Sequence, residues 1–289
     1  MRIVCWNMNH WRRSPAERKS AWQFLAQLKP DLALLQETVP GDDIGTANVV
    51  FRSQGIGSSR PWGSAVVSFG RPALAVTEAR SRYSKEPANL HQTLPGSLAI
   101  ARVGDLTLIS HYGVIEKGYA VTTIHRQLSD LTPLFDSSLG RRVVLGGDLN
   151  ISSQLKEPDR RRHRNVLDRL ASLGMVDCLA LDRPPRPKLE GCPCADSPCR
   201  HVRTQRYKND KSGTPWQNDY IFVSESLAGV VESCFALDSG NPDPWQFSDH
   251  CPVILELGIE MAEPGAAPNG GPATQLGNSG VTEGPPSVS

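Results

Sequence analysis

Acidic, amide and imidazole side chains stand at the ends of most of the short apolar runs in this sequence. They are, in chain order, Asn7, Glu37, His111, Asp148, Asn150, Asp219, Asp249 and His250. Oxygen atoms of carboxylates and amides bind hard divalent cations, and imidazoles and carboxylates transfer protons. Because polar groups gathered at strand ends are typical of a site on a rigid sheet, we expect these residues to converge in space.

The apolar runs themselves predict strands, because they are short, rich in Val and Ile, and bounded by Gly, Pro, Asp or Asn. They cover residues 3–6, 32–35, 64–69, 98–103, 106–110, 143–147, 220–223 and 252–257. Two of these runs are separated by Gly104 and Asp105 alone, which predicts an antiparallel hairpin. Helices are predicted over residues 15–28, 125–138 and 157–174.

The order of these elements predicts an α/β fold, a four-layer α/β/β/α sandwich of two mostly antiparallel sheets with outer helices. One domain is expected over residues 1–260. Residues 261–289 are rich in Gly, Pro, Ala and Ser, and they hold too little apolar surface to offset the entropy of ordering. We therefore expect a disordered C-terminal tail.

Composition excludes some classes of protein. No apolar run approaches the roughly 18 residues that a membrane span needs, so no membrane span is predicted. The formal net charge of +1 indicates no partner, and a nucleic-acid ligand would need a local basic patch. The odd count of seven cysteines and an N-terminus unlike a signal peptide predict a reducing, cytoplasmic setting, and no protein partner is indicated.

The polar residues belong to seven short motifs that span residues 5–253. The motifs are CWNMN (5–9), PDLALLQE (30–37), GSAVVS (63–68), SHYG (110–113), GGDLN (146–150), NDYIFVS (218–224) and SDHCPV (248–253). Each motif alone is weak, but in this order the set resembles the endonuclease/exonuclease/phosphatase superfamily, which includes deoxyribonuclease I. The resemblance implies a metal-dependent phosphoesterase.

The resemblance also implies a role for each polar residue. Glu37 would be the principal carboxylate ligand of Mg²⁺ or Mn²⁺, with Asn7 and Asp249 supporting it or holding a second ion. These cations neutralise charge that develops on a phosphate. The catalytic set implied by the resemblance is His111, Asp148, Asn150, Asp219 and His250.

Within that set, the resemblance pairs His250 with Asp219 and lets Asp148 align or deprotonate the attacking water. Whether His250 or Asp148 takes the proton stays open. His111 would act on the leaving oxygen or the transition state, as in the deoxyribonuclease I and sphingomyelinase branches, which carry a histidine there. By this resemblance the chain looks closer to those two branches. Trp216, near Asp219, is instead similar to an aromatic wall of the AP endonucleases, and this mixed signal leaves the substrate open.

A Cys/His-rich loop over residues 191–201 is a second feature that could do chemistry. Three cysteines and a histidine within ten residues, Cys192, Cys194, Cys199 and His201, would supply one structural tetrahedral Zn²⁺ site. A metal would explain how a Pro-rich segment without a core is ordered. The alternatives are a flexible loop with incidental thiols and a redox-active cluster.

Aromatic and basic residues near the polar motifs predict a substrate rim. We assign Trp11, Arg12 and Trp216 to it, because a base or a lipid group can pack on an indole ring. The run DRRRHR (159–164) is more typical of a solvated helix face than of a phosphate-binding surface.

We therefore expect hydrolysis of a phosphoester bond with Mg²⁺ or Mn²⁺, and a nucleic-acid phosphodiester is the favoured substrate. One alternative is a phosphatase or phosphodiesterase that acts on a small phosphoester or a phospholipid head group. Another is an inactive nucleic-acid-binding module, against which the intact set of acids and imidazoles argues.

Overall fold

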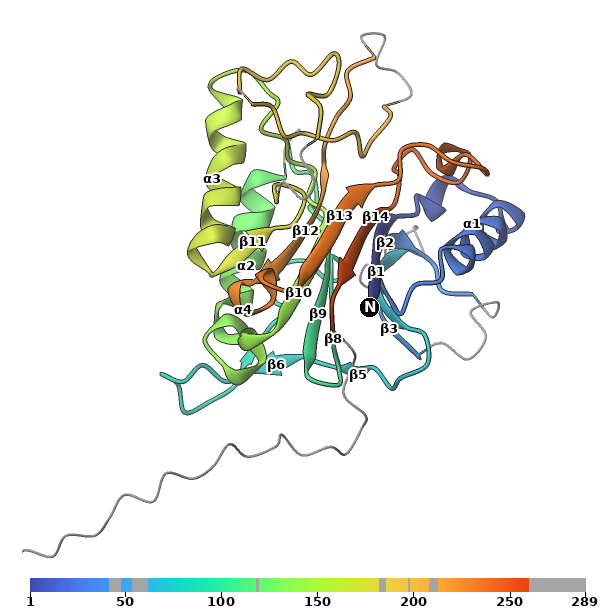
Figure 1. Ribbon diagram of the computed structural model, residues 1–289. Helices are drawn as coiled ribbons and strands as arrows, with labels where there is room; N and C mark the ends of the chain where they lie inside the picture. Colours follow the sequence, from blue (N-terminus) through green and yellow to red (C-terminus); the bar gives the residue numbers. More distant parts are fainter. Residues whose placement is uncertain are drawn as a thin grey trace, which may run out of the picture.

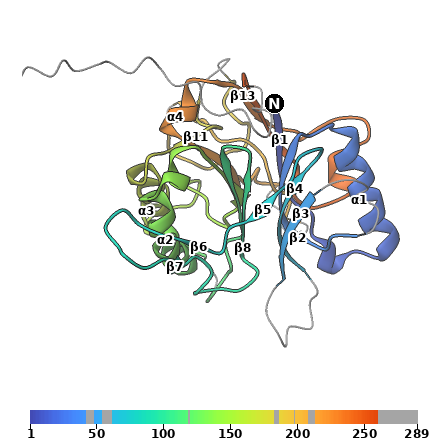
Figure 2. The same ribbon diagram turned by 90° about the horizontal axis from the view of Figure 1, so that it is seen from below.

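The computed structural model describes residues 1–41, 48–53, 62–117, 120–181, 186–196, 198–207 and 213–259, so the predicted tail lies outside the described residues. Two sheets, each of six strands in this part of the chain, pack face to face, and helices cover both outer faces (Figures 1 and 2). The predicted four-layer α/β/β/α sandwich is thereby confirmed. None of the described helices has the length and hydropathy of a membrane-spanning segment.

The first sheet has the strand order β13-β14-β1-β2-β4-β3. Its neighbouring strands are antiparallel except for the parallel pair β1 and β2. The strands are β1 (Arg2–Asn7), β2 (Leu32–Thr38), β3 (Asn48–Ser53), β4 (Gly63–Ser68), β13 (Val231–Ala236) and β14 (Val253–Leu257).

The second sheet has the order β11-β12-β10-β9-β8-β5, with β9 and β10 parallel. Its predicted hairpin is confirmed, because Val103 pairs with Leu106 across Gly104, which has a φ of +60°. The strands are β5 (Leu74–Ala75), β8 (Leu98–Val103), β9 (Leu106–His111), β10 (Val143–Asp148), β11 (Met175–Asp177) and β12 (Asp219–Ser224). A separate small pair is formed by β6 (Glu78–Ala79) and β7 (Ala88–Asn89).

Helices pack on the outer faces of the sandwich. Trp6 of β1 packs against Phe24 of α1 (Pro15–Gln27) on one side. On the other side, α2 (Val121–Phe135) and α3 (Asp159–Ser172) cover the second sheet (Figure 2). The short helix α4 (Glu225–Ala228) follows β12, and 3-10 helices cover His10–Arg12, Ser138–Arg141 and Pro244–Gln246.

The central core lies between the two sheets. Cys5 and Leu34 of the first sheet and Leu108 and Val144 of the second are fully buried there. Each aliphatic side chain removed from water in this way stabilises the fold by roughly 1.5–3 kcal/mol. The core thus fixes the two sheets relative to each other, and with them every side chain that projects from their strand ends.

Strand direction explains why the polar residues meet at one edge. The parallel strands β1 and β2 both end there, as do the parallel strands β9 and β10. The antiparallel neighbour β12 begins at the same edge, with Asp219 opposite Asp148. The antiparallel strand β14 likewise begins beside the end of β1. The strand ends and strand starts that carry the polar motifs are therefore neighbours.

Candidate active site

Asp148, at the end of β10, joins the two sheets. Its side chain is almost fully buried, and its Oδ2 accepts a hydrogen bond of 2.9 Å from Nδ2 of Asn7 on β1. The backbone N–H of Asn150 donates to Oδ1 at 3.0 Å, and its side-chain amide lies 3.2 Å from Oδ2. Three donors therefore orient this carboxylate before any substrate is bound.

His250 is held between two carboxylates. Its Nδ1 lies 2.8 Å from Oδ2 of Asp219, and its Nε2 lies 3.8 Å from Oδ2 of Asp148. The imidazole is buried, and the amide of Gln205 is 3.1 Å from Nε2. A carboxylate on one ring nitrogen fixes the orientation of the ring and directs the other nitrogen toward the centre of the site.

The charges in this group shift the pKa values of its members. Burial alone would lower the pKa of His250, but the negative charges of Asp219 and Asp148 outweigh it and raise that pKa to about 10. Burial also raises the pKa of Asp148, while the neighbouring His250 opposes this rise. We therefore treat His250 as an imidazolium near neutral pH and the carboxyl group of Asp148 as its partner.

Glu37 reaches the site through an irregularity in β2. The register against β4 shifts between Leu35 and Thr38, and Glu37 has a φ of +46°. A bulge of this kind redirects a side chain that strict alternation would send to the other face. Asn7 and Tyr112 hydrogen-bond to the carboxylate and lower its pKa, but the larger effect is burial, which raises the pKa.

Asp249 lies beside this group at its more open side. Its Oδ1 accepts a hydrogen bond of 2.6 Å from Nδ2 of Asn9, a residue in the left-handed region with a φ of +50°. The negative charge of Asp249 contributes to the raised pKa of Glu37. The predicted metal ligands Asn7, Glu37 and Asp249 are thus linked to one another by contact or by charge.

The structure brings together seven of the eight predicted polar residues and leaves His111 apart. The imidazole of His111 is fully buried on the helix side of the second sheet, where its Nε2 lies 3.0 Å from Oε1 of Gln127 on α2. Alternation along β9 directs Ser110 to the inner face, where its hydroxyl accepts a hydrogen bond from the side-chain amide of Gln36. Tyr112, next in the chain, is the residue that contacts Glu37. The prediction that His111 acts on the leaving oxygen is not supported by this placement, and neither is the branch preference that rested on it.

Sequence reasoning also missed the residues that support the site from outside the strand ends. They are Asn9, Tyr112, Gln205 and Arg206. Asn9 and Tyr112 belong to motifs that were recognised, CWNMN and SHYG, so the motifs carried a signal for them. Gln205 and Arg206 come from the segment after the Cys/His-rich loop, where no pattern in the sequence distinguishes them.

Two hollows adjoin the polar group. One, on the side of the first sheet, has a volume of about 510 Å³ and is lined by Arg12, Arg206 and Asp249, among others. The guanidinium of Arg12 stacks on Trp11, and that of Arg206 stacks on Trp245, with its Cζ 4.3 Å from the ring centre. Arg12, one of the three predicted rim residues, therefore lines the same hollow as Asp249, and it stacks on Trp11.

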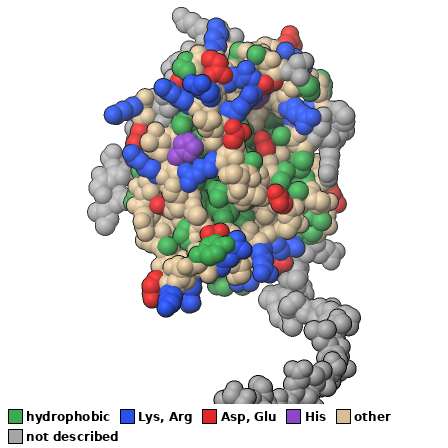
Figure 3. Space-filling view, turned by 90° about the vertical axis from the view of Figure 1, so that its left-hand side faces the viewer, with side chains coloured by type: hydrophobic (Ala, Val, Ile, Leu, Met, Phe, Trp, Pro, Cys, Tyr) green, Lys and Arg blue, Asp and Glu red, His purple; other side chains and the backbone are tan. Residues whose placement is uncertain are grey.

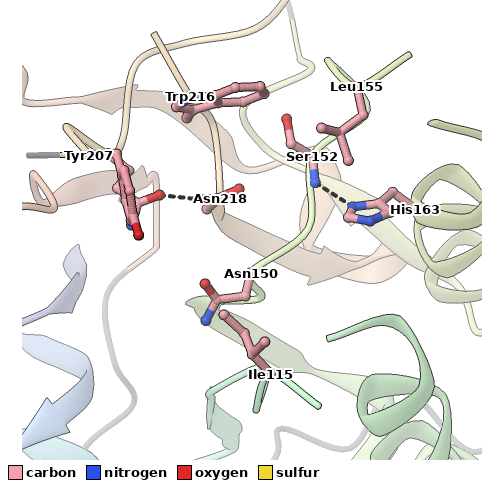
Figure 4. Close-up of a pocket in the computed structure, with 9 residues that line it drawn as sticks. Ile115, Asn150, Ser152, Leu155, His163, Tyr207, Trp216 and Asn218 are labelled. Atoms are coloured by element: carbon pink, nitrogen blue, oxygen red, sulfur yellow. Dashed lines mark hydrogen bonds between the residues drawn. The ribbon is translucent and has the colours of Figure 1, made fainter. Parts of the chain in front are cut away.

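The second hollow lies on the side of the second sheet and has a volume of about 300 Å³. Figure 4 shows Trp216, Tyr207 and Ile115 around it, with Asn150 and Asn218 between Trp216 and Ile115. Trp216, another predicted rim residue, thus lines a different hollow from Arg12. An apolar wall next to polar amides suits a ring that carries hydrogen-bonding groups.

The four predicted zinc ligands are also brought together. One ligand atom from each of Cys192, Cys194, Cys199 and His201 lies within 4.8 Å of the others. A second group of this kind in the described residues is Asp148, Asp219 and His250, which belongs to the polar site.

Residues 4–250 match the family described as Endonuclease/Exonuclease/phosphatase family, which is most of the chain and contains every residue of the polar group. The chain belongs to the Endonuclease/Exonuclease/phosphatase family. A search of curated proteins finds no match to it.

Solved structures with the fold of this family resemble the chain over about nine-tenths of its length. An AP endonuclease from Archaeoglobus fulgidus has a TM-score of 0.59 at 20% identity and covers 90% of this chain and 100% of its own. The catalytic domain of Xenopus laevis APE2 has a TM-score of 0.63 at 17% identity, with 89% and 91% covered. The endonuclease domain of TRAS1, a telomere-specific non-LTR retrotransposon, has a TM-score of 0.58 at 16% identity, with 90% and 99% covered. At these identities the likeness establishes the fold.

Proposed function

We propose that this protein hydrolyses phosphodiester bonds of nucleic acid with the help of a divalent cation, Mg²⁺ or Mn²⁺. The observation that carries the proposal is the buried chain of contacts from Asp219 through His250 and Asp148 to Asn7, with Glu37 beside it. Acids, an imidazole and amides fixed at the edge of a rigid sheet are suited to phosphoryl transfer to water.

The donor set fits a hard divalent cation. Glu37, Asp249 and the amide oxygen of Asn7 are the oxygen ligands that Mg²⁺ and Mn²⁺ prefer, and these three residues would hold it. Several carboxylates act on the pKa values of Glu37 and Asp148, whereas His250 is the one cation among the larger influences from the described residues. The polar group therefore carries excess negative charge. A bound cation would supply positive charge next to the scissile phosphate.

The residues of the chain have separate tasks in this proposal. Asp219 holds Nδ1 of His250, so the protonated Nε2 faces the centre of the site and stabilises negative charge on the phosphate. Asp148, oriented by Asn7 and Asn150, accepts the proton of the attacking water. A histidine with a pKa near 10 is a poor base at neutral pH, which supports assigning the proton to Asp148.

The surroundings of the site favour nucleic acid over a small phosphoester. Arg12 and Arg206 offer guanidinium groups to neighbouring phosphates, and the hollow beside Trp216 offers an aromatic wall to a base or sugar. The solved structures of the same fold are named as endonucleases or AP endonucleases, which supports the same substrate class. A nucleic-acid strand that extends to both sides of the scissile phosphodiester can occupy both hollows at once.

The test is a hydrolysis assay with the full chain, wild type and Asp148→Asn. Substrates are plasmid DNA, a duplex with one abasic site, RNA, and bis-p-nitrophenyl phosphate, each with Mg²⁺, Mn²⁺ or EDTA. We expect turnover of a nucleic acid that EDTA abolishes and that Asp148→Asn reduces by roughly 10²–10⁴-fold, since a general base contributes about that much.

Circular dichroism of the variant serves as the control, because Asp148→Asn keeps the shape of the side chain and the fold should be retained. Cleavage that persists unchanged in Asp148→Asn would remove the assigned role of this residue. Tight binding of nucleic acid without turnover of any substrate would instead support an inactive binding module. Turnover of small phosphoesters alone would favour the alternative of a phosphatase or phosphodiesterase that acts on small substrates.

A further inference from the structure

The described part of residues 186–207 lies near the active site without regular structure of its own. Its described residues form no helix or strand and make one bridging pair each with Trp216 and His250, through Gln205. Figure 1 draws it above α3 and the start of β12. A segment that lacks a core of its own needs a cross-link to hold one conformation. Its three cysteines, however, are free thiols.

Two distances within the Cys/His group match the edges of a tetrahedral zinc site. Nδ1 of His201 lies 3.7 Å from Sγ of Cys192 and 3.5 Å from Sγ of Cys199. With Zn–S bonds of about 2.3 Å and Zn–N bonds of about 2.0–2.1 Å, a tetrahedron has an S···N edge of about 3.6 Å. Cys194 completes the set, and its side chain is buried like that of Cys199.

Neighbouring groups already orient the ligand atoms. Nε2 of His201 lies 2.7 Å from the hydroxyl of Ser153, so Nδ1 is turned toward the sulfurs. The side-chain amide of the buried Gln154 donates to Sγ of Cys192 at 3.2 Å, a bond that suits a thiolate. Contacts of this kind to the free nitrogen of a histidine and to a sulfur accompany metal ligands in proteins.

The charge around the group suits an anionic metal centre. One Zn²⁺ with three thiolates and a neutral imidazole carries a net charge of −1. Arg160 and Arg164 of α3 both bind Asp196, which lies between the cysteines in the sequence. Figure 3 shows Lys and Arg side chains gathered on the upper part of the face that carries α3. The positive charges of Arg160 and Arg164 act on His201, and they would offset the negative charge of such a centre.

We propose that Cys192, Cys194, Cys199 and His201 bind one structural Zn²⁺, which fastens this segment against the ends of the two catalytic strands β10 and β12. All four positions of the tetrahedron are occupied by protein, so the ion has no open position for chemistry. This proposal concerns a second metal, separate from the oxygen-ligand site at Glu37, and it stands whether or not the protein is a nuclease.

The residues after His201 connect this zinc site to the active site. The backbone N–H of Val202 donates to Oε1 of Gln217 at 3.0 Å. The hydroxyl of Thr204 accepts a hydrogen bond of 3.1 Å from the backbone N–H of Asp219. The backbone of Arg206 donates to the carbonyl oxygen of Asp249 at 2.8 Å. A cross-link at His201 therefore fixes a segment that lies directly on the Asp219–His250 pair.

The first measurement is metal content. We expect about one zinc per chain in purified wild-type protein by elemental analysis, and a loss of about tenfold or more in Cys199→Ser. Cys234→Ser is the matched control, because Cys234 lies on β13 and should leave the zinc content unchanged. Glu37→Gln should also keep its zinc, which separates this ion from the catalytic one.

The second measurement does not depend on how the cysteine variants fold. Reduced, metal-free wild type is titrated with Co²⁺, and we expect the charge-transfer bands of a tetrahedral cobalt–thiolate centre to saturate at about one equivalent. Ser153→Ala keeps all four ligands but removes the contact to His201, and we expect roughly 10–100-fold weaker zinc binding in competition with a chelator. Wild type without stoichiometric zinc and without thiolate–cobalt bands would overturn the proposal. A disulfide in that protein would show a redox cluster instead.

Discussion

At the scale of single residues, we expect the pair of Asp219 and His250 to determine how the site responds to pH. The carboxylate of Asp219 is among the charges that raise the pKa of His250 against the effect of burial. If the imidazolium is the working form, activity falls as pH rises through that pKa. The alkaline limit of activity therefore reports the strength of this contact.

We expect Asp219→Asn to move the alkaline limb of the kcat/KM profile to lower pH, because an amide no longer stabilises the imidazolium of His250. Turnover at the optimum should fall by roughly 10²-fold or more, as the ring also loses its orientation. The measurement is kcat/KM against pH for wild type and variant on the best nucleic-acid substrate. An unmoved alkaline limb would show that another group controls it. His250→Gln is the control, and its residual activity should lack this limb.

The neighbouring residues His111 and Tyr112 show how far the sequence alone could go at this scale. The motif SHYG correctly indicated that this strand end belongs to the site. Alternation along a strand means that one of two neighbours faces the site, but the sequence does not tell which one. His111 packs against α2, while Tyr112 contacts Glu37. Burial and the charge of Glu37 raise the pKa of Tyr112, so its hydroxyl stays protonated and donates.

We expect His111→Gln to change stability rather than catalysis. Burial lowers the pKa of His111 from 6.5 to about 4, so the unfolded chain binds more protons between these values. The stability that depends on a neutral His111 is fully present above pH 6.5 and is lost as pH falls toward 4. Between pH 7 and 5 this effect should lower the free energy of unfolding by about 2 kcal/mol. Urea unfolding at both pH values should show a weaker pH dependence in the variant, with kcat changed by only a few-fold. A loss of kcat above 100-fold with unchanged stability would restore the catalytic role.

At the scale of elements, the strands that the sequence predicted are those buried on both faces. The two strands of the first sheet that it missed, β3 and β13, form the edges of that sheet. In β13 the exposed Glu232 separates the apolar residues, and in β3 the apolar run is limited to Val49, Val50 and Phe51 between exposed ends. Helix α2 begins at Val121, four residues before its predicted start at 125. The prediction began too late because no side chain caps this helix, so the sequence gives no start signal.

The glycine pair of GGDLN is required by the packing of β10. A Cβ at Gly147 would overlap the carbonyl oxygen of His111 on β9. A Cβ at Gly146 would lie 2.8 Å from a methyl group of Leu34 in the opposite sheet. The motif thus has a structural reason that is independent of chemistry, since these glycines let β10 lie close enough to place Asp148 beside Asn7.

We expect Gly147→Ala to destabilise the fold by about 1–3 kcal/mol or more, because the added methyl group forces two backbones apart. Gly229→Ala is the matched control, since a Cβ there meets no atom within 4 Å, and its effect should be within about 0.5 kcal/mol. Urea unfolding of both variants gives the comparison. Equal stability of the two variants would show that β10 can move away from β9 without cost.

At the scale of the whole molecule, the order of the motifs along the chain carried more information than any single element. The motifs span residues 5–253, and the family match spans residues 4–250. The resemblance therefore predicted the sandwich and the set of residues at its edge. It did not predict the contribution of residues 186–207, because Gln205 and Arg206 reach the site through loop geometry that no periodicity records.

The net charge of +1 gives the molecule little overall attraction for a polyanion, so binding must depend on local arginines. Arg12 and Arg206 stack on Trp11 and Trp245 beside Asp249, which holds their guanidinium groups at the rim of the site. Each phosphate contact releases condensed counterions, so its loss changes the salt dependence of binding as well as the affinity. The two arginines come from segments far apart in the sequence, and their contributions should be separable.

We expect Arg12→Ala and Arg206→Ala each to weaken binding of a DNA duplex and to reduce the slope of log K against log salt concentration by about 1. Arg102→Ala on β8 is the control, because its guanidinium is bound to the carbonyl oxygen of Gly104 and lines neither hollow. Binding is measured by fluorescence anisotropy at several salt concentrations in the Asp148→Asn background, so that no cleavage occurs. If both rim variants kept the slope of Arg102→Ala, the phosphates would have to be bound elsewhere on the surface. If Arg206→Ala alone changed the slope, the substrate would follow the segment of Arg206 rather than the 3-10 helix His10–Arg12.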